Sequence, residues 1–129
     1  MKVLALDYGS ARTGVAVSDP TGAIARPLCV VERAASKAGL ARLRELVAEQ
    51  EAERVVVGVP LTLRGEHGAQ AQETDRFVDA LQNALEVPVE RFDERFTTTL
   101  AERDGGDAPE DARAAAHLLT GWLERGSRR

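Results

Sequence analysis

The first third of the chain alternates short apolar runs with tight polar turns. The apolar runs predict three strands at about residues 2–7, 14–18 and 24–31. The turn at residues 19–22 has the sequence Asp-Pro-Thr-Gly, in which proline suits the second turn position and glycine closes the turn. Connections this short join antiparallel strands. The chain is therefore predicted to begin as an antiparallel meander.

The apolar period then changes to that of a helix. Leu40, Leu43 and Val47 recur at helical spacing and predict a helix at about residues 36–50. The continuous β-branched run that follows predicts a strand at residues 54–59, of the kind that is covered on both faces. Pro60 ends that strand, and residues 61–68 are predicted to form a loop.

The second half of the chain repeats this helix–strand pattern and ends in helices. A helix is predicted at about residues 69–85 and a short strand at 87–92. A third helix is predicted to begin within residues 97–99, where Thr99 and Glu102 have the spacing of a capping box, and to end at 104–106. The last helix is predicted to run from about residue 107 to 125, with Ala115, Leu118 and Trp122 on its apolar side.

These elements predict an α/β fold. Three antiparallel strands followed by two helix–strand units give a five-stranded mixed sheet, and right-handed crossovers place the later strands parallel to the first. The expected strand order is 3-2-1-4-5, with helices on both faces. One domain should span residues 1–125, and residues 126–129 form a short basic tail. Ligands in such folds bind at the carboxyl ends of the parallel strands.

Composition restricts the chemistry of any metal site. Cys29 is the sole cysteine and lies in an apolar run, which favours a core residue, and the chain has two histidines. A site built from thiolates or from Cys and His is therefore excluded, and a metal would be held by carboxylates and water. Such ligands favour magnesium or manganese.

The charge and the apolar runs of the chain bear on nucleic-acid binding and on the cellular compartment. The net charge of −4 argues mildly against nucleic-acid binding, although a carboxylate cluster that awaits metal makes the metal-free charge more negative. Arginines are frequent in the last third of the chain, either as a solvated surface or as contacts to nucleic acid. No apolar run approaches the roughly 20 residues that cross a bilayer, and the N-terminus does not read as a signal peptide. We expect a cytoplasmic protein.

Three acidic residues are candidates for catalysis. Asp7 and Glu94 lie at the carboxyl ends of strands that should be parallel, and Asp111 lies four residues before Ala115 on the apolar side of the last helix. All three should gather at one edge of the sheet. Such a cluster is what a pair of divalent ions needs to activate water and stabilise the leaving oxygen in phosphodiester cleavage. Gly9 would let a phosphate approach the backbone.

Structural interpretations stand beside these roles. Asp7 could cap the turn, Glu94 could pair with Arg91 or Arg95, and Asp111 could complement the helix dipole. Arg95, like Asp93 and the threonines that follow, could be a strand-end or capping group, or Arg95 could contact a phosphate.

Three further polar residues are judged mainly structural. Asp19 is expected to stabilise its turn, and His67 receives no catalytic role, with an approach to the substrate from the loop at residues 61–68 as the alternative. His117 is predicted to lie off the apolar stripe of its helix and receives no catalytic role.

Four segments of the chain resemble the YqgF/RuvX family, whose members are RNase H-like proteins described as Holliday junction resolvases and pre-16S rRNA nucleases. They are Leu-Asp-Tyr-Gly at residues 6–9 with residues 12–19, Gly-Val-Pro-Leu at 58–61 with Gly65, residues 93–98 with Ala101 and Glu102, and Asp111 with Ala114, Ala115 and Leu119. The match is in order and spans nearly the whole chain. The stretch from Ala101 to Glu110 departs from the family, because it is short and mostly acidic where relatives carry a longer basic segment.

The resemblance implies an RNase H-like fold and a metal-dependent nuclease that matures the 5′ end of 16S rRNA. It places the catalytic and metal-binding roles on Asp7, Glu94 and Asp111, with magnesium or manganese, as two ions, as the cofactor. We expect Gly9, Arg12, Arg95 and Thr97 to contact the nucleic acid.

Alternative functions remain open on the sequence. The same chemistry could act on branched DNA, where resolvases generally work as homodimers. A nucleic-acid or ribosome-binding module without activity is a second alternative. An actin-like sugar kinase is disfavoured, because that architecture needs two such domains and the chain has room for one.

Overall fold

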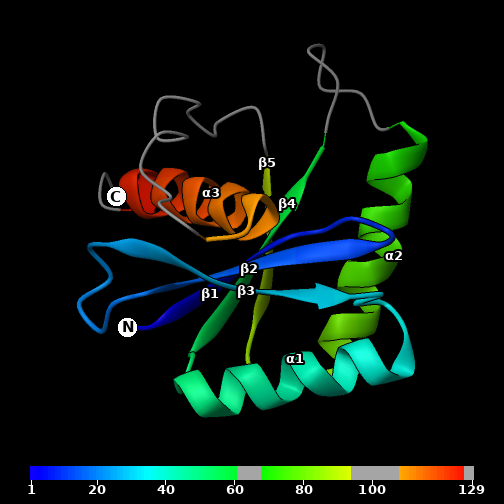
Figure 1. Ribbon diagram of the computed structural model, residues 1–129, viewed down its shortest axis with the longest axis horizontal. Helices are drawn as coiled ribbons and strands as arrows, with labels where there is room; N and C mark the ends of the chain where they lie inside the picture. Colours follow the sequence, from blue (N-terminus) through cyan, green and yellow to red (C-terminus); the bar gives the residue numbers. More distant parts are fainter. Residues whose placement is uncertain (61–67, 94–107, 127–129) are drawn as a thin grey trace.

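A five-stranded mixed sheet runs through the middle of the protein (Figure 1). The computed structural model describes residues 1–60, 68–93 and 108–126. In chain order its elements are β1 (Val3–Asp7), β2 (Arg12–Ser18), β3 (Ala25–Glu32), α1 (Lys37–Gln50), β4 (Arg54–Val59), α2 (Ala69–Ala84), β5 (Val89–Asp93) and α3 (Glu110–Gly126). The helix predicted to begin within residues 97–99 lies outside the described residues.

The strand order is β3-β2-β1-β4-β5, as predicted. β1 pairs antiparallel with β2 and parallel with β4, and β4 pairs parallel with β5. In this register Leu6 lies beside Val57, and Val59 lies beside Asp93. The carboxyl ends of β1, β4 and β5 therefore meet at one edge of the sheet.

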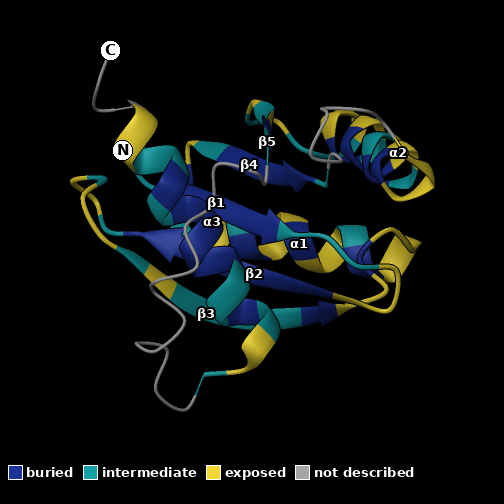
Figure 2. Cartoon of the chain, turned by 90° about the horizontal axis from the view of Figure 1, so that it is seen from above, coloured by how far each residue is buried: buried dark blue, intermediate teal, exposed yellow. Residues whose placement is uncertain are grey.

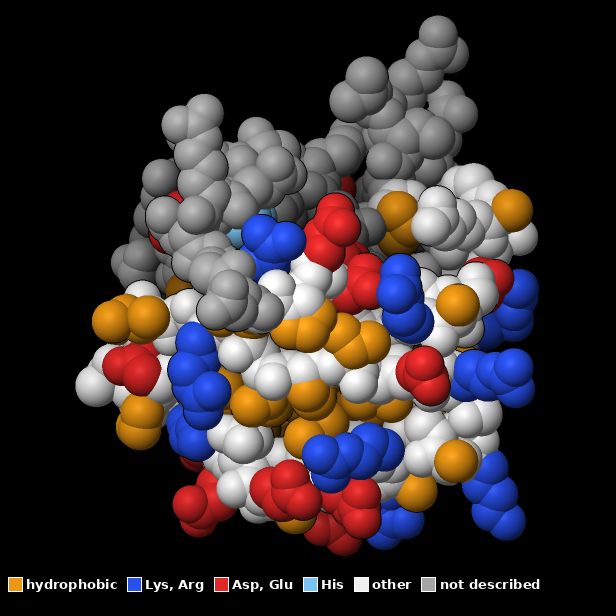
Figure 3. All heavy atoms as spheres, viewed as in Figure 1, with side chains coloured by type: hydrophobic (Ala, Val, Ile, Leu, Met, Phe, Trp, Pro, Cys, Tyr) orange, Lys and Arg blue, Asp and Glu red, His pale blue; other side chains and the backbone are white. Residues whose placement is uncertain are grey.

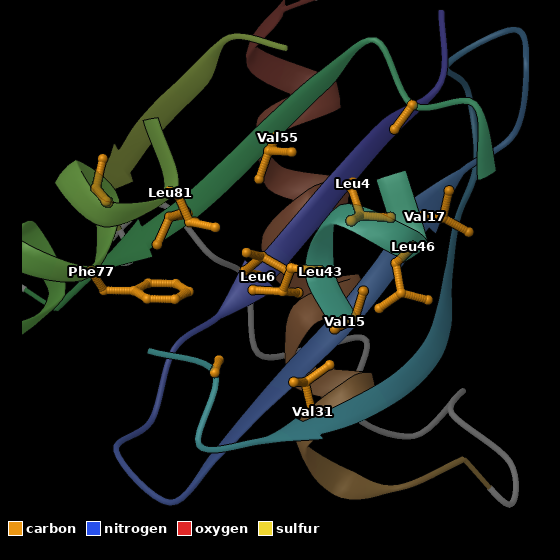
Figure 4. Packing of buried hydrophobic residues seen from close by; sticks show 14 residues of the cluster. Leu4, Leu6, Val15, Val17, Val31, Leu43, Leu46, Val55, Phe77 and Leu81 are labelled. Carbon is orange, nitrogen blue, oxygen red and sulfur yellow. The ribbon is translucent and has the colours of Figure 1, made fainter. Parts of the chain in front are cut away.

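Helices cover both faces of the sheet, which explains the long apolar run of β4. Alternate strand residues point to opposite faces. One face packs against α1 and α2, as Figure 4 shows for side chains of β1, β2, β3 and β4 with Leu43, Leu46, Phe77 and Leu81. The other face packs against α3 through Val56, Phe92 and Leu119, among others. Buried residues accordingly concentrate in the strands, while exposed residues lie on the turns and the outer sides of the helices (Figure 2).

The same alternation places Asp7 on the face that α3 covers. Val3 and Ala5 of β1 pack in the cluster with α3, whereas Leu4 and Leu6 pack toward α1 and α2. Asp7 continues the series of Val3 and Ala5. A carboxylate at the end of this buried strand thus faces the same side as the last helix.

The element ends follow local chemistry. Ser36 caps α1, because its hydroxyl oxygen accepts a hydrogen bond from the Gly39 amide at 3.0 Å. β2 begins at Arg12, two residues before the predicted start, since Arg12 and Thr13 pair with Glu32 and Val31 of β3.

The prediction for His117 was wrong. His117 is buried, and so are its neighbours in the continuous stretch from Ala115 to Leu119. The helix is therefore covered around more of its circumference than a single apolar stripe would require. In the described parts of the chain, no helix combines the length and apolar character needed to cross a membrane.

Candidate functional site

Asp7 ends the central strand and is half-buried on the face that α3 covers. Its partner in the antiparallel pairing of β1 with β2 is Gly14. Asp7 also has a contact beyond those of the strand pairing. The strand pairing therefore fixes the backbone that carries the Asp7 carboxylate at the edge of the sheet.

Gly14 allows the start of α3 to lie directly on β2. A β-carbon at this position would lie 1.8 Å from the carbonyl oxygen of Asp111 and 2.9 Å from the amide nitrogen of Ala112. No other residue fits in that space without moving the helix. Because Gly14 is also the partner of Asp7, the same contact brings the first turn of α3 beside the end of β1.

Asp111 occupies that first turn, together with Glu110. Its Oδ2 atom forms an ion pair with Nε of Arg12 at 3.3 Å, and the two side chains are 36% and 65% exposed. Exposed ion pairs typically contribute about 0–1 kcal/mol. Asp111 also suits the positive end of the helix dipole. The structural and the functional interpretation of Asp111 are thus compatible.

Tyr8 fixes the strand end from the opposite face. Its ring stacks on Phe77 of α2, with ring centroids 4.3 Å apart, and its hydroxyl donates a hydrogen bond to Oε2 of Glu73 at 2.9 Å. Burial, followed by the hydrogen bond and the negative charge of Glu73, raises the pKa of Tyr8 to about 12. Sequence reasoning did not assign Tyr8 a role, although an aromatic residue directly after a candidate acid was a usable signal.

The loop after Tyr8 is held closed by Gly9 and Thr13. A β-carbon on Gly9 would lie 2.5 Å from the carbonyl oxygen of Arg12, so the tight connection itself requires glycine. The buried Thr13 hydroxyl lies 3.4 Å from both the amide and the carbonyl of Gly9. The contact of Gly9 and Arg12 with nucleic acid remains a prediction.

Part of the predicted site lies outside the described residues. This applies to Glu94, Arg95 and Thr97, and also to His67. Across residues 1–60, 68–93 and 108–126, no group of three His, Cys, Asp or Glu side chains is arranged to hold a metal ion. The structure thus brings the backbone of Asp111 against Gly14, the strand partner of Asp7, and the joint action of the three acids remains a prediction.

The two candidate acids within the described residues, Asp7 and Asp111, have the chemistry that a hard divalent cation needs. Asp7 and Asp111 offer carboxylate oxygens, the ligands that magnesium and manganese prefer. A cationic group, the Arg12 guanidinium, already lies against one of these carboxylates. The position is therefore electrostatically suited to positive charge.

Asp19 has the structural role expected of it. Its carboxylate accepts hydrogen bonds from the amides of Ala23 and Ile24 and from the Thr21 hydroxyl. These hydrogen bonds, led by that of Ile24, lower the pKa of Asp19 to about 2.

Cys29 and Arg91 also belong to the structural framework. Cys29 packs against the core, and burial raises the pKa of its thiol. Arg91 forms ion pairs with Asp75 and Asp79 of α2. An ion pair of Arg91 with Glu94, one of the structural interpretations of Glu94, would therefore have to compete with the ion pairs that Arg91 forms with Asp75 and Asp79.

Comparison with known families gives a match over residues 1–125 to the family described as "RuvX: Holliday junction resolvase". The chain belongs to the RuvX family. A relative from Chloroflexus aggregans, named "Putative pre-16S rRNA nuclease", is 50% identical over 101 residues, which cover 78% of this chain and 71% of the relative. A relative of the same name from Syntrophomonas wolfei is 38% identical and covers 98% of this chain and 96% of its own length.

Solved structures of resolvases share the fold of this RuvX protein. Thermus thermophilus RuvC in complex with a Holliday junction superposes with a TM-score of 0.64 at 21% identity, covering 98% of this chain and 96% of RuvC. The fowlpox virus resolvase bound to junction DNA gives a TM-score of 0.60 at 10% identity, covering 97% and 98%. The predicted RNase H-like fold is thereby confirmed.

The contact at Gly14 generates a prediction for Gly14→Ala. The added β-carbon should push the first turn of α3 away from β2, lower the free energy of unfolding by about 1–3 kcal/mol and weaken divalent-cation binding. Urea unfolding and calorimetric titration with Mn²⁺ would measure both effects. Gly39→Ala is the matched control, since its β-carbon would lie 2.2 Å from the Arg33 carbonyl oxygen, away from the acids. Undiminished Mn²⁺ affinity in Gly14→Ala would contradict this account.

The contact between Tyr8 and Glu73 predicts a high-pH effect. A raised folded-state pKa means that Tyr8 contributes fully to stability below pH 10 and loses that contribution as the pH rises toward about 12. Glu73→Gln should lower the pKa, though not to 10, because burial remains. Tyrosinate absorbance reports Tyr8 alone, since the chain has one tyrosine. Asp79→Asn removes a comparable charge elsewhere on α2 and should leave the titration unchanged; equal curves for Glu73→Gln and the parent would refute the assignment.

Proposed function

We propose that this RuvX protein is a divalent-metal-dependent endonuclease that hydrolyses phosphodiester bonds in structured nucleic acid, with the 5′ end of precursor 16S rRNA as its substrate. The observation that carries the proposal is the packing of α3 on Gly14, which brings Asp111 to the strand end that carries Asp7. Membership of the RuvX family supports nuclease chemistry at this position. This work would take place in the cytoplasm.

The acids would divide the metal-binding work between them. Asp7 and Asp111, with Glu94 from the segment after β5, would hold magnesium or manganese, most simply as two ions. When bound, the metal would supply activation of the attacking water and stabilisation of the leaving oxygen.

The stacked and hydrogen-bonded Tyr8 keeps the end of β1 fixed. Arg12 and Arg95 would bind phosphate, and Gly9 and Thr97 would contact the backbone of the nucleic acid. Cleavage would leave a 5′ phosphate and a 3′ hydroxyl.

The names of the relatives favour RNA as the substrate. The two relatives compared above carry the rRNA nuclease name at 50% and 38% identity. The resolvases share the fold at 21% identity or less, which supports no substrate assignment. The family description is what favours the second candidate, a homodimeric enzyme that cuts four-way DNA junctions. The stretch from Ala101 to Glu110, which departs from the pattern of the family, favours the third, a binding module without activity.

The proposal predicts that Asp7→Asn abolishes cleavage while the fold persists. The neutral amide keeps the size of the side chain but is a poorer ligand for a divalent ion, so the rate should fall by at least about a hundredfold. Cleavage of labelled precursor rRNA in Mg²⁺ or Mn²⁺, with a chelator as the blank, would measure this, and circular dichroism would check the fold. Asp19→Asn is the control, because the Asp19 carboxylate accepts hydrogen bonds from backbone amides of its own turn. An Asp7→Asn protein as active as the parent would sink the assignment.

The choice of substrate is tested by direct competition. Precursor 16S rRNA with its 5′ extension and a four-way DNA junction would be offered side by side in Mg²⁺ or Mn²⁺, with the oligomeric state measured by light scattering. We expect faster cleavage of the RNA. Preferential cutting of the junction by a dimer would instead establish the resolvase, and cleavage of neither, together with no divalent-ion binding at millimolar concentration, would establish the binding module.

A further inference from the structure

We propose that Arg12 and the divalent cation compete for the carboxylate of Asp111, so that cation binding releases Arg12 to hold a phosphate of the nucleic acid. The inference rests on the proposed function, because it assumes that Asp111 is a metal ligand. It adds a coupling between the two ligands: the cation and the nucleic acid should each strengthen the binding of the other.

The ion pair between Arg12 and Asp111 has the properties of a replaceable contact. Nε of Arg12 lies 3.3 Å from Oδ2 of Asp111, and the Arg12 side chain is 65% exposed. Exposed pairs of this kind contribute little to stability, so a divalent ion on the same carboxylate can displace the guanidinium at small cost. Within the described part of the chain, the Arg12 side chain has no other hydrogen bond or ion pair.

The backbone around the pair is fixed, so displacement involves the Arg12 side chain alone. Arg12 pairs with Glu32 of β3, and the Arg33 amide donates to the carbonyl of Ala11 at 3.0 Å. Asp111 cannot follow the arginine, because its backbone packs on Gly14. The freed guanidinium therefore stays at the carboxyl edge of the sheet. Figure 3 shows that acidic and basic side chains already lie next to each other on the surface near the start of α3.

A released arginine suits the substrate. The guanidinium is always charged and matches a phosphate with two parallel donors. While it pairs with Asp111, its charge is partly neutralised and less available to nucleic acid. Binding free energies are reciprocal, so an arginine that the cation releases makes cation and nucleic acid bind cooperatively.

The first test measures cation affinity without nucleic acid. In calorimetric titrations of the full chain with Mn²⁺, Arg12→Gln should bind about two- to fivefold more tightly than the parent, the range expected for loss of an exposed ion pair. Arg44→Gln on α1 removes the same net charge and controls for the effect of the overall protein charge on cation affinity. In an Asp111→Asn background the gain from Arg12→Gln should vanish. A gain that persists there, or equal affinity of Arg12→Gln and the parent, overturns the proposal.

The second test measures the coupling itself. A fluorescein-labelled RNA hairpin with a 5′ extension is titrated with each protein, with and without Ca²⁺, and its integrity is checked on a gel. The parent should bind the RNA more tightly when Ca²⁺ is present, and Arg12→Gln should lose most of that gain, whereas Arg44→Gln should keep it. An equal gain in the parent and in Arg12→Gln overturns the inference and leaves the nuclease proposal intact. If neither protein binds a divalent ion, the proposed metal-dependent function fails as well.

Discussion

The site depends on one steric contact, that of the first turn of α3 with the bare backbone of Gly14. A side chain at this position would overlap the Asp111 carbonyl, so helix and strand can approach this closely only at glycine. Because Gly14 is also the strand partner of Asp7, the contact sets the relation between two acids that are far apart in the chain. The position of the acids is thus fixed by backbone packing and does not depend on an interaction between the carboxylates themselves, which would repel each other.

The end of β1 is anchored by contacts on both faces of the sheet. The backbone that carries Asp7 is therefore fixed even though it lies at the edge of the sheet. On one face Tyr8 stacks on Phe77 and bonds to Glu73 of α2. On the other face α3 packs over β2. Asp7 lies between these two anchors, at the last position of a strand whose preceding residues are buried. A ligand site at such a strand end needs little reorganisation when it binds a cation, because the backbone carrying the acid is already ordered.

The sequence predicted the sheet well because each of its signals was local. Apolar alternation, turn residues and the right-handed crossover rule are enough to give the strand order and the edge at which Asp7 lies. The contact of Gly14 with Asp111 could not be predicted in this way, because it depends on how close α3 approaches the sheet. The hydrogen bond of Tyr8 to Glu73 of α2 and the burial of His117 in α3 were missed because they too depend on how a helix packs in the folded protein. Periodicity indicates which face of a helix is apolar, but not how widely that face is covered.

The negative net charge of the chain becomes easier to reconcile with a nucleic-acid substrate once the acids are counted as metal ligands. The formal charge of −4 includes Asp7, Glu94 and Asp111. Two divalent ions bound there would bring the total to zero, and they would place positive charge at the edge where a phosphate has to approach. Charge counted on the metal-free chain therefore understates its attraction for nucleic acid. Arg12 has a related effect in the metal-free protein, since its pairing with Asp111 offsets part of the negative charge that would otherwise repel a phosphate.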